Sequence, residues 1–389
     1  MPRQPPRALL VVTVLLPAVL LACSPPAERH TPAPTPSTPA PAAAPPAGPA
    51  CADLAALSGR DRLAQLLMVG VRDAADARAV VTDHHVGGIF IGSWTDLSML
   101  KDGSLASISN VAGPLPLAVS VDEEGGRVSR LSSLIGSSPS ARELARTRTP
   151  EQVQQLATER GRKMHDLGIT IDFAPVADVV SRDAPDDTVI GDRSFGSDPQ
   201  QVTSYAGAYA QGLRDAGLLP VLKHFPGHGH GSGDSHTAGA VVTPPLAELQ
   251  KEDLVPYRTL VAQAPVAVML GHLEVPGLTG DEPASLSPAA VQLLRDGTGY
   301  DGPPFGGLVF SDDLSSMAAI SDHYGVAEAV LHTLQAGVDV ALWVTTGEVP
   351  AVLDRLEKAV AAAELKPETI DAALNRLVAV KRPGAHCER

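Results

Sequence analysis

The feature that most constrains this chain is a series of short apolar runs that alternate with stretches of helical periodicity. Breaks marked by Gly or Pro separate the runs. The eight runs span residues 66–71, 88–92, 117–121, 170–175, 219–224, 266–271, 307–311 and 338–344. Strands without internal polar alternation indicate a parallel sheet that is covered on both faces. Eight strand–helix units favour a single α/β barrel, (β/α)8 of the TIM type, over an open doubly wound sheet.

Amphipathic helical patterns fill the intervals between the apolar runs. The clearest cover residues 150–167, 199–216, 246–263, 287–295, 323–336 and 367–380. Polar residues stand at or near the carboxyl ends of five runs: Asp122, Asp172, His224, His272 and Asp312. Because TIM-barrel active sites form at that rim, we expect a catalytic site there.

The N-terminal segment has the pattern of an export signal. Arg3 and Arg7 precede the apolar run 9–21, which is too short to span a bilayer comfortably. The following Leu-Ala-Cys at residues 21–23 resembles a bacterial lipobox with Cys23 as the lipidated residue, although an ordinary cleaved signal would leave Cys23 incidental. We expect a signal peptide over 1–22, a disordered Pro/Ala-rich tether over 23–50 and the barrel over 51–389. A lipid anchor would hold the protein on the outer face of the cell membrane.

The two remaining cysteines bear on the redox environment of the protein. Cys51 and Cys387 stand at the two ends of the expected barrel, which closure brings together. In an oxidising compartment we expect a disulfide between them, the alternative being two unpaired thiols near the chain ends.

The net charge of −14 argues against nucleic acid or an anionic membrane surface as a partner. We expect a monomer that acts on a carbohydrate.

The segment 223–236 is the richest in chemistry. It leaves a predicted strand at Lys223 and His224 and enters a loop dense in glycine and histidine, where Asp234 and His236 lie two residues apart. A local turn would set the carboxylate against the imidazole and make His236 a general acid/base. Four histidines in this segment also suggest zinc, but neither an HExxH pattern nor a pair of cysteines accompanies them. The glycine spacing does not match a dinucleotide-binding motif, so we expect neither metal nor cofactor.

Several motifs, in order, resemble those of bacterial β-N-acetylhexosaminidases of glycoside hydrolase family 3. The most specific is Lys-His-Phe-Pro-Gly-His-Gly at 223–229, followed after four residues by Asp-Ser-His at 234–236. The other matching segments are 122–130, 173–176, 191–195, 283–287 and 310–314. Two departures stand out: Glu123 replaces a Gln that many relatives carry, which should matter little, and Ser315-Ser316 lengthens the loop after Asp312.

The resemblance implies a role for each matching residue. Asp312 would be the nucleophile, and His236, assisted by Asp234, would protonate the leaving group and later activate water. The residues implied to bind the terminal sugar are Asp122, Arg130, Arg193, Lys223 and His224. For Arg130 a surface salt bridge is the alternative. Because an unpaired buried charge is costly, we expect these groups to pair with one another in the empty site.

The function implied is that of a retaining exo-β-N-acetylglucosaminidase that acts through a covalent glycosyl-enzyme on peptidoglycan fragments in cell-wall turnover. Three alternatives remain. Phosphate could replace water as the acceptor, which would make the enzyme a phosphorylase. The substrate could be a plain β-glucoside. The barrel could also be an inactive glycan-binding lipoprotein, against which the intact Asp312, Asp234 and His236 argue.

Overall fold

The computed structural model describes residue 54, residues 56–234 and residues 239–382. The predicted signal peptide, tether and lipidated Cys23 therefore lie outside the described residues, as do His236 and the expected Cys51–Cys387 pair. The described residues all belong to one compact unit, formed by residues 47–389. None of the helices in this part is long and apolar enough to cross a membrane.

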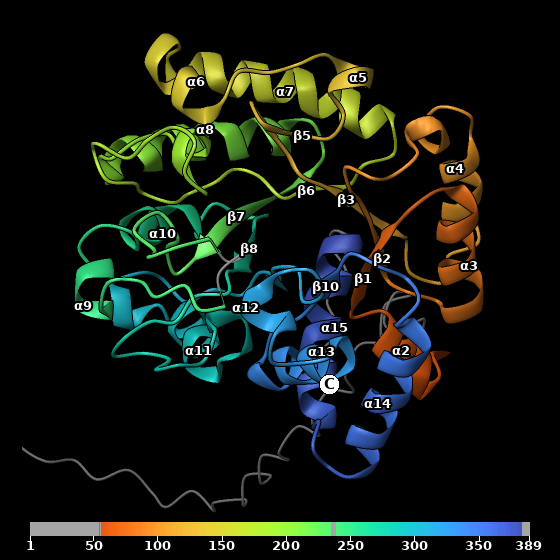
Figure 1. The fold of residues 1–389 in the computed structure, drawn as a ribbon. Helices are drawn as coiled ribbons and strands as arrows, with labels where there is room; N and C mark the ends of the chain where they lie inside the picture. The colour runs from red at the N-terminus through yellow and green to blue at the C-terminus, as the bar shows by residue number, and fades with distance from the viewer. Residues whose placement is uncertain (1–53, 55, 235–238, 383–389) are drawn as a thin grey trace, which may run out of the picture. The chain divides into compact units, whose positions relative to one another are not determined.

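Eight parallel strands form one sheet that curves into a barrel, with helices around it (Figure 1). In spatial order the strands are β10 (Ala341–Trp343), β1 (Leu67–Val71), β2 (Gly88–Ile91), β3 (Ala118–Val121), β6 (Ile171–Asp172), β7 (Leu219–Phe225), β8 (Ala267–Leu270) and β9 (Val309–Ser311). A parallel bridge between Phe310 and Val340 joins β9 to the entry of β10 and closes the ring. Each strand coincides with a predicted apolar run, so the barrel expected from the sequence is confirmed.

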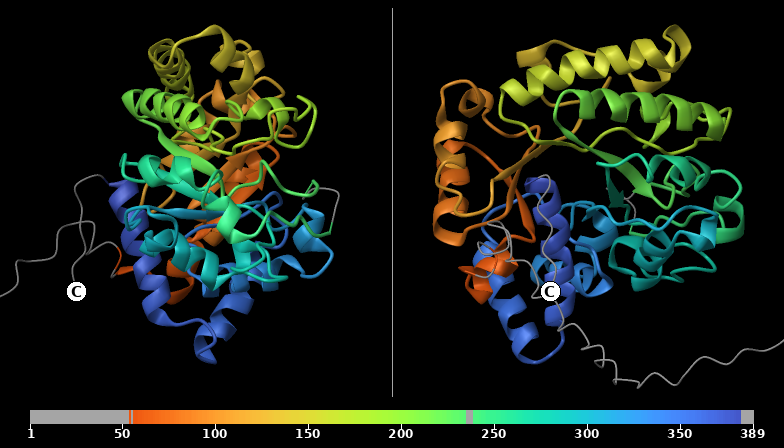
Figure 2. Two further views of the ribbon diagram at one scale, coloured as in Figure 1. Left: turned by 90° about the vertical axis from the view of Figure 1, so that its left-hand side faces the viewer. Right: turned by 180° about the vertical axis from the view of Figure 1, so that it is seen from behind.

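The helices follow the strands and surround them (Figure 2). They are α2 (Gly59–Ala64), α3 (Ala74–His84), α4 (Ser104–Ser109), α5 (Ser132–Ile135), α6 (Ala141–Thr147), α7 (Pro150–Asp166), α8 (Pro199–Asp215), α9 (Leu246–Leu249), α10 (Val255–Leu260), α11 (Pro288–Asp296), α12 (Ala318–Ser321), α13 (Val326–Ala336), α14 (Val349–Ala361) and α15 (Pro367–Lys381). The pattern 246–263 predicted one helix, but it forms α9 and α10. Pro256 lies in the first turn of α10, where its missing N–H is tolerated, and it could not stand inside a continuous helix.

A short β-hairpin at the top of the barrel was not predicted from the sequence. Its strands β4 (Glu123–Gly125) and β5 (Val128–Ser129) follow β3 directly and pair antiparallel. Gly125 adopts φ +93°, and a Cβ there would lie 2.5 Å from the carbonyl oxygen of Pro139. The turn therefore requires glycine, and it folds residues 122–130 back over the barrel mouth.

Opposite ends of the barrel are stabilised in different ways. Near the mouth, the rings of Phe90, Phe173 and Phe310 fill the interior, with successive centroids 5.8 Å and 5.4 Å apart. At the amino ends of β9 and β10, the fully buried Asp339 pairs with Arg295 at 2.6 Å and with Arg376 at 2.8 Å. These ion pairs tie α11 and α15 to the closing strands.

Candidate active site

A cavity of about 320 Å³ opens at the carboxyl ends of the barrel strands. Six of the sequence-predicted site residues line it: Asp122, Arg130, Arg193, Lys223, His224 and Asp312. They come from β3, the hairpin, the 3-10 turn η2 (Gly191–Arg193), β7 and the end of β9. The barrel therefore brings together residues up to 190 positions apart (312 − 122) in one pocket.

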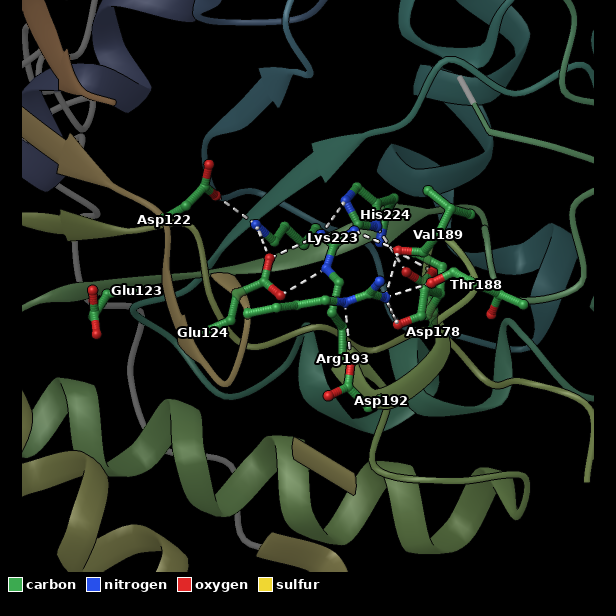
Figure 3. A network of polar contacts seen from close by, with 12 residues as sticks. Asp122, Glu123, Glu124, Asp178, Thr188, Val189, Asp192, Arg193, Lys223 and His224 are labelled. Atoms are coloured by element: carbon green, nitrogen blue, oxygen red, sulfur yellow. Dashed lines mark hydrogen bonds and ion pairs between the residues drawn. The ribbon is translucent and has the colours of Figure 1, made fainter. Parts of the chain in front are cut away.

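Four charged side chains of the pocket form a continuous chain of ion pairs (Figure 3). Lys223 Nζ lies 2.6 Å from Asp122 Oδ1 and 2.6 Å from Glu124 Oε1. Arg193 donates from Nε and Nη2 to the two oxygens of Glu124, both at 2.8 Å. The expectation that the site's charged groups pair with one another is thus confirmed for these residues, and Glu124, which was not predicted as a site residue, is the central member.

Mutual attraction fixes the charge state of this chain of ion pairs. Burial alone would raise the pKa of Glu124, but Arg193 and Lys223 lower it below the usual range. Burial alone would lower the pKa of Lys223, yet Asp122 and Glu124 raise it. The pKa of Arg193 is likewise raised, because Glu124 outweighs the effect of burial. The buried members are therefore ionised at neutral pH, and with Asp122 they place two positive charges beside two negative ones.

His224 is held in place by a carboxylate behind the pocket. Asp178 is fully buried, and its Oδ2 lies 2.7 Å from His224 Nδ1, while its Oδ1 accepts from the backbone N–H groups of His224 and His228. Burial would raise the pKa of Asp178, but His224 and the hydrogen bonds lower it. An ionised Asp178 makes Nδ1 of His224 the donor, so Nε2 is free of that bond and lies 3.5 Å from Arg193 Nη2.

A second histidine faces the same pocket. The ring of His228 lies edge-on to that of His224, with centroids 5.6 Å apart. Burial, followed by repulsion from His224, lowers the pKa of His228 to about 4. His228 is therefore neutral near pH 7 and adds no charge to the pocket.

Asp312 lies at the end of β9, on the rim of the cavity. Its backbone N–H donates to the carbonyl of Leu270, and its Oδ1 accepts from the N–H of Asp313 at 2.9 Å. Burial alone would raise the pKa of Asp312, but His272, His224 and the hydrogen bond from Asp313 lower it to about 2. Asp312 is thus an ionised carboxylate in the pocket, which is the state that a nucleophile requires.

The loop after Asp312 includes the two serines that depart from the family pattern. The carboxylate of Asp313 accepts from Ser315 N at 2.9 Å and Ser315 Oγ at 2.8 Å, and from both polar groups of Ser316. These bonds hold Asp313 in the loop and leave Asp312 as the carboxylate at the strand end. Both serines therefore help to order this part of the rim.

Two of the five polar residues at strand ends lie behind the pocket. Asp172 is fully buried and accepts from Glu123 N at 3.0 Å, and burial raises its pKa well above the ordinary value. His272 lies between Ser285 Oγ at 2.6 Å and the carbonyl of Asp313 at 2.7 Å. Both residues support the backbone of the site from beneath, so position at a strand end did not by itself identify a pocket residue.

Glu123 forms an ion pair behind the pocket. Its side chain is fully buried, pairs with Arg160 of α7 at 2.6 Å and accepts from Leu131 N at 2.8 Å. Figure 3 shows it apart from the network that Glu124 joins. The effect of the replacement itself stays a prediction, but the ion pair shows that Glu123 joins the hairpin that carries Glu124 to α7.

The glycine-rich loop after β7 is held by a histidine–carboxylate pair. His230 Nδ1 lies 3.0 Å and 3.1 Å from the two oxygens of Asp253, and a Cβ at Gly227 would lie 2.4 Å from that residue's Cβ. Asp234 follows in the same loop and is half-buried, outside the lining of the cavity. His236 lies outside the described residues, so the predicted Asp234–His236 pair stays a prediction.

Sequence reasoning missed Glu124, Asp178 and His228. Glu124 could have been predicted as a site residue, because residues two apart on an extended chain share a face and Asp122 was already assigned to the site. Asp178 could not have been predicted, because its partner His224 is 46 positions away. Among residues 54, 56–234 and 239–382, no cluster of three or more His, Cys, Asp or Glu is arranged to hold a metal ion.

Comparison with known proteins agrees with this fold and pocket. The model of the glycosyl hydrolase family 3 N-terminal domain matches residues 59–380. The chain therefore belongs to glycosyl hydrolase family 3, as its motifs suggested, and is a glycoside hydrolase.

Individual relatives and solved structures are similar to this chain over most of its length. The chain is 66% identical over 393 residues to the β-hexosaminidase LpqI of Mycobacterium tuberculosis, a match that covers 99% of both chains. The solved structure of M. tuberculosis LpqI superposes with a TM-score of 0.84 at 72% identity, covering 88% of this chain and 98% of that one. A family 3 β-N-acetylglucosaminidase from a Paenibacillus species superposes with a TM-score of 0.76 at 32% identity. The match covers 86% of this chain and 65% of that one.

Proposed function

We propose that this glycoside hydrolase is a retaining exo-β-N-acetylglucosaminidase. The observation that carries the proposal is the placement of ionised Asp312 in a pocket whose charged network is internally paired. Each member of that network can exchange an internal partner for a sugar hydroxyl. The names of the relatives support N-acetylhexosamine as the terminal sugar.

The proposed reaction has two steps. In the first, Asp312 attacks the anomeric carbon, the glycosidic C–O bond breaks, and His236 gives its proton to the departing oxygen. In the second, water attacks the same carbon, His236 takes the proton of the water, and the bond to Asp312 breaks. Two displacements on one carbon return the original β configuration. Asp234 supports the charged form of His236.

We infer that the substrate is a fragment of cell-wall peptidoglycan and that the enzyme is exported and lipid-anchored. The lipobox-like sequence ending at Cys23 and the Pro/Ala-rich stretch after it support this location. A Cys23→Ala variant expressed in a bacterium should move from the membrane fraction to the soluble fraction. An unchanged membrane fraction would reject the anchor at Cys23.

The test of the activity is release of nitrophenol from a β-N-acetylglucosaminide. We expect Asp312→Ala to lose about 10⁶-fold in kcat, the size measured when the nucleophile of another hydrolase is removed. The exposed Asp281→Asn is the matched control and should keep full activity. Proton NMR of the released sugar should show the β anomer first. Activity on a β-glucoside alone would reject the substrate, and a sugar 1-phosphate formed only with added phosphate would make the enzyme a phosphorylase.

A further inference from the structure

Trp94 is unusual among the aromatic side chains of this protein. It is 45% exposed, the largest value for any aromatic residue in the part of the chain that the structure describes. Most of the other large aromatic side chains lie in the buried core. An indole left in solvent beside a pocket is a common mark of a binding surface, because it offers a large apolar face for a ligand to cover.

The indole is held in one position from below. A Cβ on Gly92 would lie 2.4 Å from two atoms of the ring, so the ring lies across the backbone of that glycine. Its centroid is 6.0 Å from that of Phe90. Thr95, the next residue, donates from Oγ1 to the carbonyl of Val71 at 2.6 Å and accepts from Gly92 N at 3.0 Å. The loop is therefore fixed to β1, and Trp94 presents a rigid surface.

This surface lies where two cavities meet. Trp94 and Val344 line both the active-site cavity and a neighbouring cavity of about 530 Å³. The second cavity lies at the carboxyl ends of β1 and β10, on the opposite side of the barrel mouth from the Lys223 strand, β7. Its other lining residues are mostly polar: Gly70, Arg72, Asp76, Thr345, Thr346, Gly347 and Glu348.

The polar groups of the second cavity are also ordered. Arg72 donates from Nε and Nη2 to Asp76, both at 3.2 Å, and Thr346 Oγ1 donates to the same carboxylate at 2.8 Å. Thr345 Oγ1 donates to Glu348 Oε2 at 2.6 Å. An apolar ring beside fixed donors and acceptors suits a sugar, whose C–H face packs on an aromatic ring while its hydroxyls form hydrogen bonds.

We propose that Trp94 is the platform for the sugar on the leaving-group side of the scissile bond, and that the neighbouring cavity takes the substituents of that sugar. This inference rests on the proposed function. The active-site cavity, at about 320 Å³, is near the lower end of ligand-pocket volumes, so it suits the terminal sugar alone. The rest of the substrate must leave the pocket, and the exit past Trp94 leads into a second cavity. The ligand class is a hexopyranose, such as a second N-acetylhexosamine.

The test compares two substrates that share the terminal sugar and differ in the leaving group. N,N′-diacetylchitobiose places a sugar on the leaving-group side, whereas β-N-acetylglucosaminyl azide places none there. Trp94→Ala should lower kcat/KM for the disaccharide about 10- to 100-fold, the range that loss of one stacked ring produces. It should change kcat/KM for the azide by less than about twofold. Trp94→Phe should restore most of the disaccharide activity.

Tyr324→Ala is the matched control, because Tyr324 is also an exposed aromatic and lines neither cavity. It should leave both substrates unchanged. An equal loss on both substrates in Trp94→Ala and Trp94→Phe would overturn the proposal, since the indole would then support the pocket itself. No loss on the disaccharide would overturn it as well. A wild-type enzyme inert on both substrates would reject the proposed function, and the subsite with it.

Discussion

Nδ1 of His224 lies 2.7 Å from Oδ2 of the buried Asp178, which leaves Nε2 of the same ring beside Arg193. The carboxylate thereby holds the ring of His224 in one orientation, with Nδ1 as the donor to Asp178 and Nε2 directed toward the guanidinium. The two backbone bonds that Asp178 accepts, from His224 and His228, add rigidity to the end of β7. A residue behind the pocket surface thus fixes how His224 is oriented in the pocket.

Asp178→Asn should therefore lower kcat/KM about 100-fold, the size expected for a misplaced pocket group. The amide oxygen would keep the two backbone bonds, and the amide N–H groups would face Nδ1. The ring would then lose its negatively charged partner, and the orientation of Nε2 beside Arg193 would no longer be fixed. Steady-state kinetics with the exposed Asp183→Asn as control would check this prediction. Wild-type kinetics in Asp178→Asn would contradict the positioning role of Asp178.

Glu124→Gln should destabilise the protein by about 3–5 kcal/mol at pH 7, because Arg193 would lose the carboxylate with which it forms an ion pair. The pKa of Glu124 is lowered in the folded state, so its stabilising effect is complete above the ordinary glutamate pKa of about 4.3 and is lost as the pH falls below it. The gap in Tm between wild type and variant should consequently shrink between pH 7 and about pH 3.5.

Calorimetry at the two pH values would measure that gap. The exposed Glu282→Gln serves as control and should change stability by less than about 0.5 kcal/mol at either pH. A gap of constant size would show that ionisation of Glu124 contributes nothing to the difference.

Asp339→Asn should lower the free energy of unfolding by about 3–5 kcal/mol, since two arginines would lose their buried counter-ion. The KM should stay unchanged, because Asp339 lies at the end of the barrel away from the cavity. Urea denaturation beside a KM measurement separates the two effects. Asp296→Asn, on the exposed last turn of α11, is the control. A raised KM with normal stability would refute this division of roles.

His230→Gln should cost about 1–2 kcal/mol at about pH 6 and less at about pH 9. The hydrogen bond to Asp253, the largest effect, raises the pKa of His230 despite burial. Because the pKa of His230 is higher in the folded state, its protonated form stabilises the protein fully below about pH 6.5. This stabilisation is lost as the pH rises through the pKa of the folded state. Thermal melts at both pH values, with the exposed His323→Gln as control, would measure this. An equal penalty at the two pH values would count against a charged His230.

The barrel was predictable because both faces of each strand are buried, which leaves continuous apolar runs in the sequence. Asp122, Lys223, His224 and Asp312 were identified by motifs that resemble those of family 3, and the barrel explains why they meet, since it gathers strand ends at one rim. Asp178 could not be predicted, because its contact depends on packing between distant segments. Trp94 belongs to no motif, and its importance is visible only from its exposure and its neighbours.

The chain of charges from Asp122 through Lys223 and Glu124 to Arg193 alternates in sign at every step. A hydroxyl group both donates and accepts hydrogen bonds, so it can enter between any two neighbours and satisfy each of them. An ammonium group or a phosphate would attract one neighbour and repel the other. The order of these charges therefore favours a neutral polyol over a charged ligand. This preference does not depend on the net charge of −14 that the whole chain carries.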